Sequence, residues 1–360
     1  MKVAVLAAMG LLVCSCSLGD RTSRETLTVE ADSVPFVEIP GSSADGEPIL
    51  SRAIAGTRFA DGRLLVVDQL GKDLVLFDST GQLVQRVGRA GEGPGEFQGP
   101  SWIGRCFGDS AIVWDSRLDR MTVVAPNGEV QRQFSFFKRP AFISCFPADR
   151  FALLMPPDQM FMFDPQGNAP PMHSHLVIAT ADGDSVLDLG LVQIGETRPL
   201  GVLTHISGGG HHFYLGTGDS AYVDVYDSVG RQTATIEVAD PRRPTTQAEY
   251  EHAIDARLAS MPAGNVDRVR EMMLSVPMPA MLPAYQGLFA DPVGAVWVVT
   301  SVLGDSLTVL RGTASDGRAL GTLTFPDWFS TFEVGADYVL GVAQAPDGEQ
   351  LVREYRLHRP

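Results

Sequence analysis

Three aspartates stand at similar places in the chain, each shortly after an apolar stretch of the kind that forms a buried strand. They are Asp68, Asp115 and Asp219, and Arg117 lies close to the second of them. If the fold gathers these carboxylates around one opening, they can bind a divalent cation or a polar ligand. Aspartate in such a place also caps a turn through its own side chain. We favour the turn role, and a divalent cation is the one cofactor that the sequence suggests.

Histidines form a second set of candidate ligands, because imidazole commonly binds metals. His211 and His212 lie close together, with His205 shortly before them, while His173 and His175 fall in a stretch that we expect to be a loop. No H-E-x-x-H motif or similar carboxylate spacing accompanies them. Surface or turn roles are therefore favoured for these histidines.

Other catalytic motifs are missing from the sequence. It contains no G-x-S-x-G elbow, no Walker loop and no Rossmann fingerprint. Its net charge of −15 repels phosphate backbones, which argues against nucleic acid as a partner. We interpret the acidity itself as a contribution to solubility.

The N-terminus has the pattern of an export signal. Lys2 precedes an apolar run at residues 3–13, which is too short to cross a bilayer as a helix. The run ends in Val-Cys-Ser-Cys, which resembles the bacterial lipobox, with Ser15 at the small position before Cys16. The resemblance implies cleavage before Cys16 and a diacylglyceryl group on its sulfur. The alternative is an ordinary secretory signal that leaves Cys16 unmodified.

These features predict a signal peptide at residues 1–15, a polar tether at 16–27 and a folded body at 28–360. Two or more acyl chains anchor a protein stably, and no other run approaches membrane-spanning length. We expect an exported lipoprotein of the cell membrane or outer membrane, facing the periplasm or the cell surface.

The body repeats one unit of four short strands. In the first copy, apolar or alternating stretches at residues 64–68, 74–77 and 83–87 follow one more short strand, and the last two are joined by a tight Gly-containing turn. Two later copies have Asn127-Gly128 and Asp316-Gly317 at this turn, which suits a hairpin. Four strands in about 40 to 50 residues is the period of a β-propeller blade. The high counts of Gly (37) and Pro (24) suit many tight turns.

A glycine-rich segment joins the first two units. It reads Gly-Arg-Ala-Gly-Glu-Gly-Pro-Gly-Glu-Phe over residues 88–97, with Pro100 and Ile103 after it. It is similar to the G-x-x-G-x-G-P-G-E-F-x-x-P link of NHL-repeat propellers, and the chain resembles the NHL-like six-bladed β-propeller lipoproteins of bacteria. The strong match covers only these two blades. Backbone amides of such a link can cradle an anion, although we favour a plain turn.

The repeat predicts an all-β fold, a six-bladed β-propeller closed by an N-terminal strand. The sixth blade lacks a fourth strand, and the apolar stretch at 34–39 has no blade of its own. Pairing the two removes an exposed edge. Periodicity alone leaves five or seven blades as alternatives. The expected blades are 50–88, 100–138, 140–193 (with an extra loop around 164–174), 200–239, 284–325 and 328–358.

Residues 240–283 break the repeat between blades four and five. Thr246 and Glu249 fit a capping box, and an apolar stripe follows at four-residue spacing. Asn265 can cap a second short helix, and a Pro-rich strap ends the insertion. We favour a cover for blade edges over the alternative, a lid or partner-binding knob above one mouth of the central channel.

Cys106 and Cys145 occupy the same point of successive blades, 39 residues apart. Inner strands converge near the axis of a propeller, so the two can reach disulfide distance, and export permits oxidation. Two buried thiols are the alternative. These features together favour a binding or scaffold module for an envelope protein or glycan, rather than an enzyme. The alternative function is a metal-dependent, lactonase-like propeller hydrolase or a lyase, because fold does not decide function.

Overall fold

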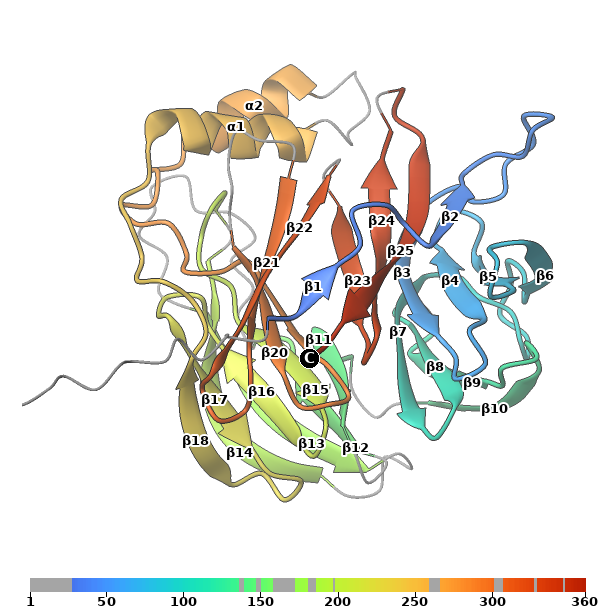
Figure 1. The fold of residues 1–360 in the computed structure, drawn as a ribbon, viewed down its shortest axis with the longest axis horizontal. Coiled ribbons are helices and arrows are strands. Elements are labelled where there is room, and N and C mark those ends of the chain that lie inside the picture. The colour runs from blue at the N-terminus through green and yellow to red at the C-terminus, as the bar shows by residue number, and fades with distance from the viewer. Residues whose placement is uncertain are drawn as a thin grey trace, which may run out of the picture.

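The computed structural model describes most of the folded body. The described residues are 28–135, 139–146, 150–157, 172–180, 186–196, 198–258, 266–300, 307–326, 329–345 and 347–360. The expected signal peptide and tether (1–27, with Cys16), residues 164–171 of the expected blade-three loop and Asn265 lie outside these ranges. The described strands form six antiparallel sheets (Figure 1), which confirms the predicted six-bladed β-propeller.

The strands of each blade follow one another in the chain. Blades one and two consist of β3 (Ala53–Arg58), β4 (Leu64–Asp68), β5 (Asp73–Phe77) and β6 (Leu83–Val87), then β7 (Pro100–Phe107), β8 (Ser110–Asp115), β9 (Arg120–Val124) and β10 (Val130–Ser135). Blades three and four consist of β11 (Phe142–Phe146), β12 (Arg150–Leu154), β13 (Met172–Thr180) and β14 (Val186–Gly195), then β15 (His205–Gly209), β16 (His212–Gly216), β17 (Tyr222–Tyr226) and β18 (Gln232–Glu237). Blade five consists of β19 (Gly287–Ala290), β20 (Val296–Thr300), β21 (Leu307–Thr313) and β22 (Ala319–Pro326), and blade six begins with β23 (Ser330–Val334), β24 (Tyr338–Gln344) and β25 (Gln350–His358).

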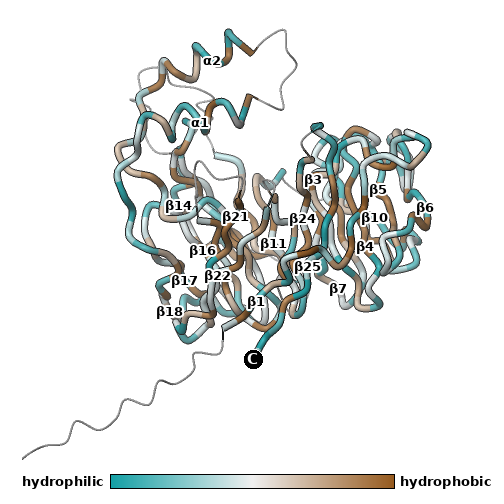
Figure 2. The backbone as a smooth tube through the Cα atoms, turned by 45° about the horizontal axis from the view of Figure 1, so that its top comes forward, coloured by the Kyte–Doolittle hydropathy of each residue, from teal (hydrophilic) through white to brown (hydrophobic). Residues whose placement is uncertain are grey.

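The hydrophobic core lies between neighbouring blades. All residues of β4 and β5 are buried, because the adjacent blades cover both faces of these central strands. One apolar cluster joins Leu65 and Leu76 of blade one to Ile103 and Val113 of blade two. In Figure 2 the hydrophobic stretches follow the strands, while the outer strand β6 mixes apolar and polar residues, and all of them except Val87 are exposed. Uniformly apolar segments therefore form the central strands of a blade, and segments with more polar residues form its outer strand.

The N-terminal segment closes the ring as predicted. In β2 (Val37–Pro40), Val37 pairs with Glu354 and Ile39 pairs with Val352 of β25. A second short strand, β1 (Glu30–Ala31), pairs with the far end of β25. The closing strand begins at Val37, later than the expected stretch at 34–39. Val34 precedes it and is 69% exposed, and within β2 only the alternate residues Val37 and Ile39 are buried.

The insertion between blades four and five contains α1 (Gln247–Leu258) and α2 (Val266–Leu274), side by side at one end of the molecule (Figure 1). The capping box is present: the Glu249 carboxylate accepts the Thr246 N–H at 2.9 Å, and the Thr246 hydroxyl accepts the Glu249 N–H at 3.3 Å. The hydrogen bond from Arg243, followed by the hydrogen bonds that Thr246 donates, lowers the pKa of Glu249 to about 2.

The two helices share a small apolar core that includes Tyr250, Ile254 and Met273. Leu200, from the turn before β15, packs against this core, and the Arg198 guanidinium donates a hydrogen bond to the Pro277 carbonyl. The insertion therefore rests on the side of the propeller where the inner strands begin. Among the described residues, no helix is long and apolar enough to cross a membrane.

Candidate functional site

A cavity of about 510 Å³ lies on the propeller axis. Its lining residues come from the inner strand of every blade, namely β3, β7, β11, β15, β19 and β23, together with the turns that follow some of them. None of the lining residues comes from the insertion at 240–283, so the described helices do not close over this space. Such concave sites with mixed walls are where proteins usually bind small ligands.

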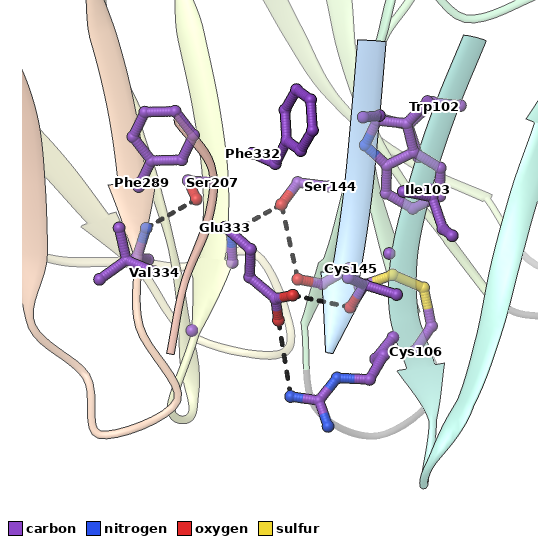
Figure 3. Close-up of a pocket in the computed structure, with 18 of the residues that line it drawn as sticks. Trp102, Ile103, Cys106, Ser144, Cys145, Ser207, Phe289, Phe332, Glu333 and Val334 are labelled. Atoms are coloured by element: carbon purple, nitrogen blue, oxygen red, sulfur yellow. Dashed lines mark hydrogen bonds and ion pairs between the residues drawn. A yellow bond between two sulfur atoms is a disulfide. The ribbon is translucent and has the colours of Figure 1, made fainter. Parts of the chain in front are cut away.

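Three aromatic rings stand on the cavity walls. Trp102, Phe289 and Phe332 come from blades two, five and six, and each is only partly buried. Figure 3 shows the three rings in the upper part of the cavity in that view, with the carboxylate of Glu333 below them. These rings give the cavity large, rigid apolar surfaces.

Hydroxyl groups of the inner strands connect neighbouring blades beside the cavity. Ser144 Oγ accepts the N–H of Gly208 at 2.6 Å, and Ser207 Oγ accepts the N–H of Ala290 at 2.8 Å (Figure 3). These bonds hold blades three, four and five together, and they place polar groups between the apolar walls.

One ion pair marks the end of the cavity where the inner strands finish. Arg105 Nη2 lies 3.5 Å from Glu333 Oε1, and Arg105 Nη1 lies 3.4 Å from Asp109. Glu333 Oε2 accepts the Thr57 hydroxyl at 2.7 Å and the Arg58 N–H at 3.1 Å. Burial opposes the charge on Arg105, but nearby negative groups, Glu333 first among them, outweigh it and raise the pKa of the guanidinium.

Cys106 and Cys145 line the same cavity (Figure 3). The structure joins them in a disulfide with a Cα–Cα distance of 5.1 Å, within the range that such bonds need. The bond ties β7 to β11, and therefore blade two to blade three, next to the ion pair.

Asp68 and Asp115 are the last residues of the equivalent strands β4 and β8, and neither lines the cavity. Both carboxylates are fully buried and accept backbone amides from the link before their blade and from the turn after their strand. For Asp68 the donors are Ser51, Arg52 and Gly71; for Asp115 they are Gln98, Gly99, Arg117 and Leu118. Through these hydrogen bonds the carboxylates cap the link before each blade and the turn after each strand. We favoured a turn role of this kind from the sequence.

The remaining candidates lie apart from one another. Asp219 is exposed and hydrogen-bonds the Thr217 hydroxyl, and the side chain of Arg117 packs over Gly99. His211 is exposed, and His212 is partly buried at the start of β16. Across the described ranges, no three His, Cys, Asp or Glu side chains group closely enough to hold a metal ion.

The placement of His173 and His175 corrects an expectation. We expected a loop there, but both residues belong to β13, which pairs along much of its length with the long strand β14. His175 Nδ1 lies 2.7 Å from Asp188 of that strand. Pairing with β14 outweighed the local sequence, in which nearby prolines suggested a loop.

The glycine-rich link behaves as a turn. The N–H of Gly93 donates to the Glu96 carboxylate at 2.8 Å, and Arg120 donates to the carbonyls of Glu92 and Gly93. Phe97, the aromatic residue of the motif, is fully buried between blades one and two. Because Glu96 itself occupies the Gly93 amide, the link does not need an external anion.

The capping role of Asp115 leads to a testable expectation. Asp115→Ala leaves several amides without an acceptor and should lower the free energy of unfolding by about 1 to 3 kcal/mol. Asp219→Ala, at an exposed site, should change it by less than about 0.5 kcal/mol. Chemical denaturation of both variants measures the difference. The capping role would be contradicted if added metal ions raised the melting temperature of the wild-type protein and of Asp219→Ala but not that of Asp115→Ala.

Comparison with known proteins agrees with the fold. A family model, DUF5128, described as a 6-bladed beta-propeller, matches residues 47–103, which span blade one and the start of β7. No curated protein matches the chain.

Solved structures with a similar fold come from several bacteria. A member of the DUF4221 family from Bacteroides vulgatus is 12% identical, with a TM-score of 0.55 over 93% of this chain and 100% of that one. A protein from Bacteroides fragilis, named as an exported protein, is 10% identical, with a TM-score of 0.52 over 92% and 96%. A gluconolactonase from Xanthomonas campestris is 13% identical, with a TM-score of 0.46 over 92% and 97%. At these identities the likeness concerns the fold alone.

Proposed function

We propose that the chain is an exported, lipid-anchored binding module of the bacterial cell envelope, of the NHL-like kind. Its axial cavity would receive part of an envelope glycan or protein partner. The observation that carries this proposal is the cavity itself, which every blade lines and which combines aromatic walls, hydroxyl groups and one ion pair. Such a mixed lining suits recognition of an organic ligand.

Catalysis receives less support from the described residues. The buried carboxylates Asp68 and Asp115 are occupied by backbone amides, and the described side chains hold no three-ligand cluster. The lactonase-like alternative needs a metal on the axis, and the axial cavity offers Glu333 as its one carboxylate among the lining residues. No specific observation favours that alternative.

The proposed anchor predicts a clear phenotype. Cys16→Ser removes the sulfur that would carry the diacylglyceryl group, so the protein should lose labelled fatty acid and leave the membrane fraction. Cys14→Ser is the matched control and should keep both the label and the membrane location. Mass spectrometry of the N-terminal peptide checks the site. An unmodified Cys16 in the wild-type protein would refute lipid anchoring.

The binding role can be tested with the full-length protein in detergent. The protein is immobilised and exposed separately to purified envelope polysaccharide and to solubilised envelope proteins. Ala55 lines the cavity, so Ala55→Trp should fill it and abolish retention. Ala234→Trp, at an exposed position on the outer strand β18, is the control and should retain binding. Failure of the wild-type protein to retain either fraction would overturn the proposal, and equal retention by Ala55→Trp would exclude the cavity.

A further inference from the structure

We infer that the axial cavity binds a neutral saccharide unit, which stacks on the aromatic walls and is held by Arg105 and Glu333. These two residues lie at the end of the cavity where the inner strands finish, which we call its floor. This inference rests on the proposed binding function and names the ligand of that same site. Four properties of the cavity support it: its charge, its polar groups, its rings and its size.

The charge of the floor argues for a neutral ligand. Arg105 and Glu333 are the two charged side chains among the lining residues, and they lie 3.5 Å apart. An anion that approaches Arg105 therefore also meets Glu333, and a cation that approaches Glu333 meets Arg105. Bringing like charges together in a partly desolvated site costs several kcal/mol. A polar ligand without net charge avoids both costs.

The polar groups call for a ligand that both donates and accepts hydrogen bonds. Arg105 makes only long contacts to its carboxylate neighbours, and its Nε has no hydrogen-bond partner among the described residues. Thr331 Oγ1, on the blade-six wall, is likewise buried without a described partner. Buried polar atoms in native proteins are nearly always satisfied. Ligand hydroxyls can serve both a guanidinium donor and a carboxylate acceptor.

The rings supply the complementary apolar surface. Trp102, Phe289 and Phe332 stand on different blades above Glu333 in Figure 3. The face of an aromatic ring carries negative potential, which attracts the weakly positive C–H groups on the face of a sugar ring. The cavity of about 510 Å³ lies within the usual range of small-molecule sites, and we expect it to hold one or two sugar rings.

Calorimetry of the full-length protein in detergent tests the ligand class. The probes are cellobiose and N,N′-diacetylchitobiose, which are neutral, a uronic-acid disaccharide, which is anionic, and a glucosamine disaccharide, which is cationic. We expect a neutral probe to bind and both charged probes to bind at least about tenfold more weakly. Binding of neither neutral probe, or a charged probe that binds as tightly as the better neutral one, would overturn the inference.

Two charge variants should switch the preference. Glu333→Gln removes the carboxylate among the lining residues and leaves Arg105 facing the cavity with Asp109, outside the lining, as its remaining carboxylate neighbour. The anionic probe should therefore gain at least about tenfold in affinity. Arg105→Gln should favour the cationic probe in the same way. Asp255→Asn and Arg270→Gln change an exposed ion pair of the insertion, 2.9 Å long, and should leave all affinities unchanged. Unaltered probe preference in both floor variants would place the saccharide elsewhere.

A third variant addresses the aromatic wall. Phe332→Ala should weaken the neutral probe at least about tenfold, whereas Tyr222→Ala, at an exposed aromatic residue on β17, should not. Melting temperatures of all variants distinguish lost binding from lost folding. If no saccharide binds but the protein still retains envelope proteins through the cavity, the saccharide inference fails and the proposed binding function stands.

Discussion

Ile39→Ala should lower the free energy of unfolding by about 2 to 5 kcal/mol, the usual cost of emptying a buried aliphatic site. Ile39 is 1% exposed and packs with Leu340 and Val352 in the core between blades six and one. Its strand, β2, supplies the fourth strand of that blade by pairing with β25. The variant therefore weakens both the core and the closure of the ring, and urea denaturation measures the loss.

Val34→Ala is the matched control, because Val34 precedes β2 and is 69% exposed. It should change the stability by less than about 0.5 kcal/mol. A loosened β2 also uncovers the edge of β25, and exposed edges promote association. We therefore expect Ile39→Ala, but not Val34→Ala, to form oligomers on warming, as seen by light scattering. Equal behaviour of the two variants would mean that β2 is not the strand that closes the ring.

Loss of the bond between Cys106 and Cys145 should cost about 4 kcal/mol in the chain-entropy account of disulfides. The two cysteines are 39 residues apart, so the bond restricts a long segment of the unfolded chain. Denaturation of the wild-type protein with and without reductant measures the cost. The double variant Cys106→Ser, Cys145→Ser should unfold as the reduced protein does, and reductant should not affect it further.

Non-reduced peptide mapping of the exported protein gives the direct check. A cross-linked pair of peptides is the expected result, and free thiols at both positions would contradict the bond. Because both cysteines are among the residues that line the axial cavity, reduction should also loosen the contact between β7 and β11 there. We expect reduced protein to bind its ligand more weakly than oxidised protein at a temperature where both remain folded.

Much of the architecture could be predicted because its causes are local in the chain. The Asn127-Gly128 turn adopts a positive φ of 84° at its glycine, which that residue type accepts without strain. The alternation of strands such as β2, and the Thr246 and Glu249 capping box, likewise depend on neighbouring residues alone. Repetition of one such unit then predicts the propeller, and the missing strand of blade six predicts where the N-terminus must pair.

The candidate site was harder to predict because its members are distant in sequence. Arg105 and Glu333 are 228 residues apart, and no motif links them. Trp102, Phe289 and Phe332 fall in ordinary short strands, and nothing around them sets them apart from core aromatics. The one feature of the sequence that could have indicated the cavity is that all these residues lie on the predicted inner strand of their blade. That feature can be used only once the number of blades and the register of each inner strand are known.

By itself, the sequence determined most of the strands and turns, the period of the repeat and the pairing of its N-terminal strand with blade six, since these follow from residue type at short range. It also favoured Asp68 and Asp115 as turn caps. The backbone amides that donate hydrogen bonds to their buried carboxylates are consistent with this role. Only the tertiary structure decided that β13 includes His173 and His175, and that the inner strands bring one ion pair and three aromatic rings around one cavity. The physical reason is that ring closure sets which inner-strand side chains face one another, and closure depends on packing between all six blades at once.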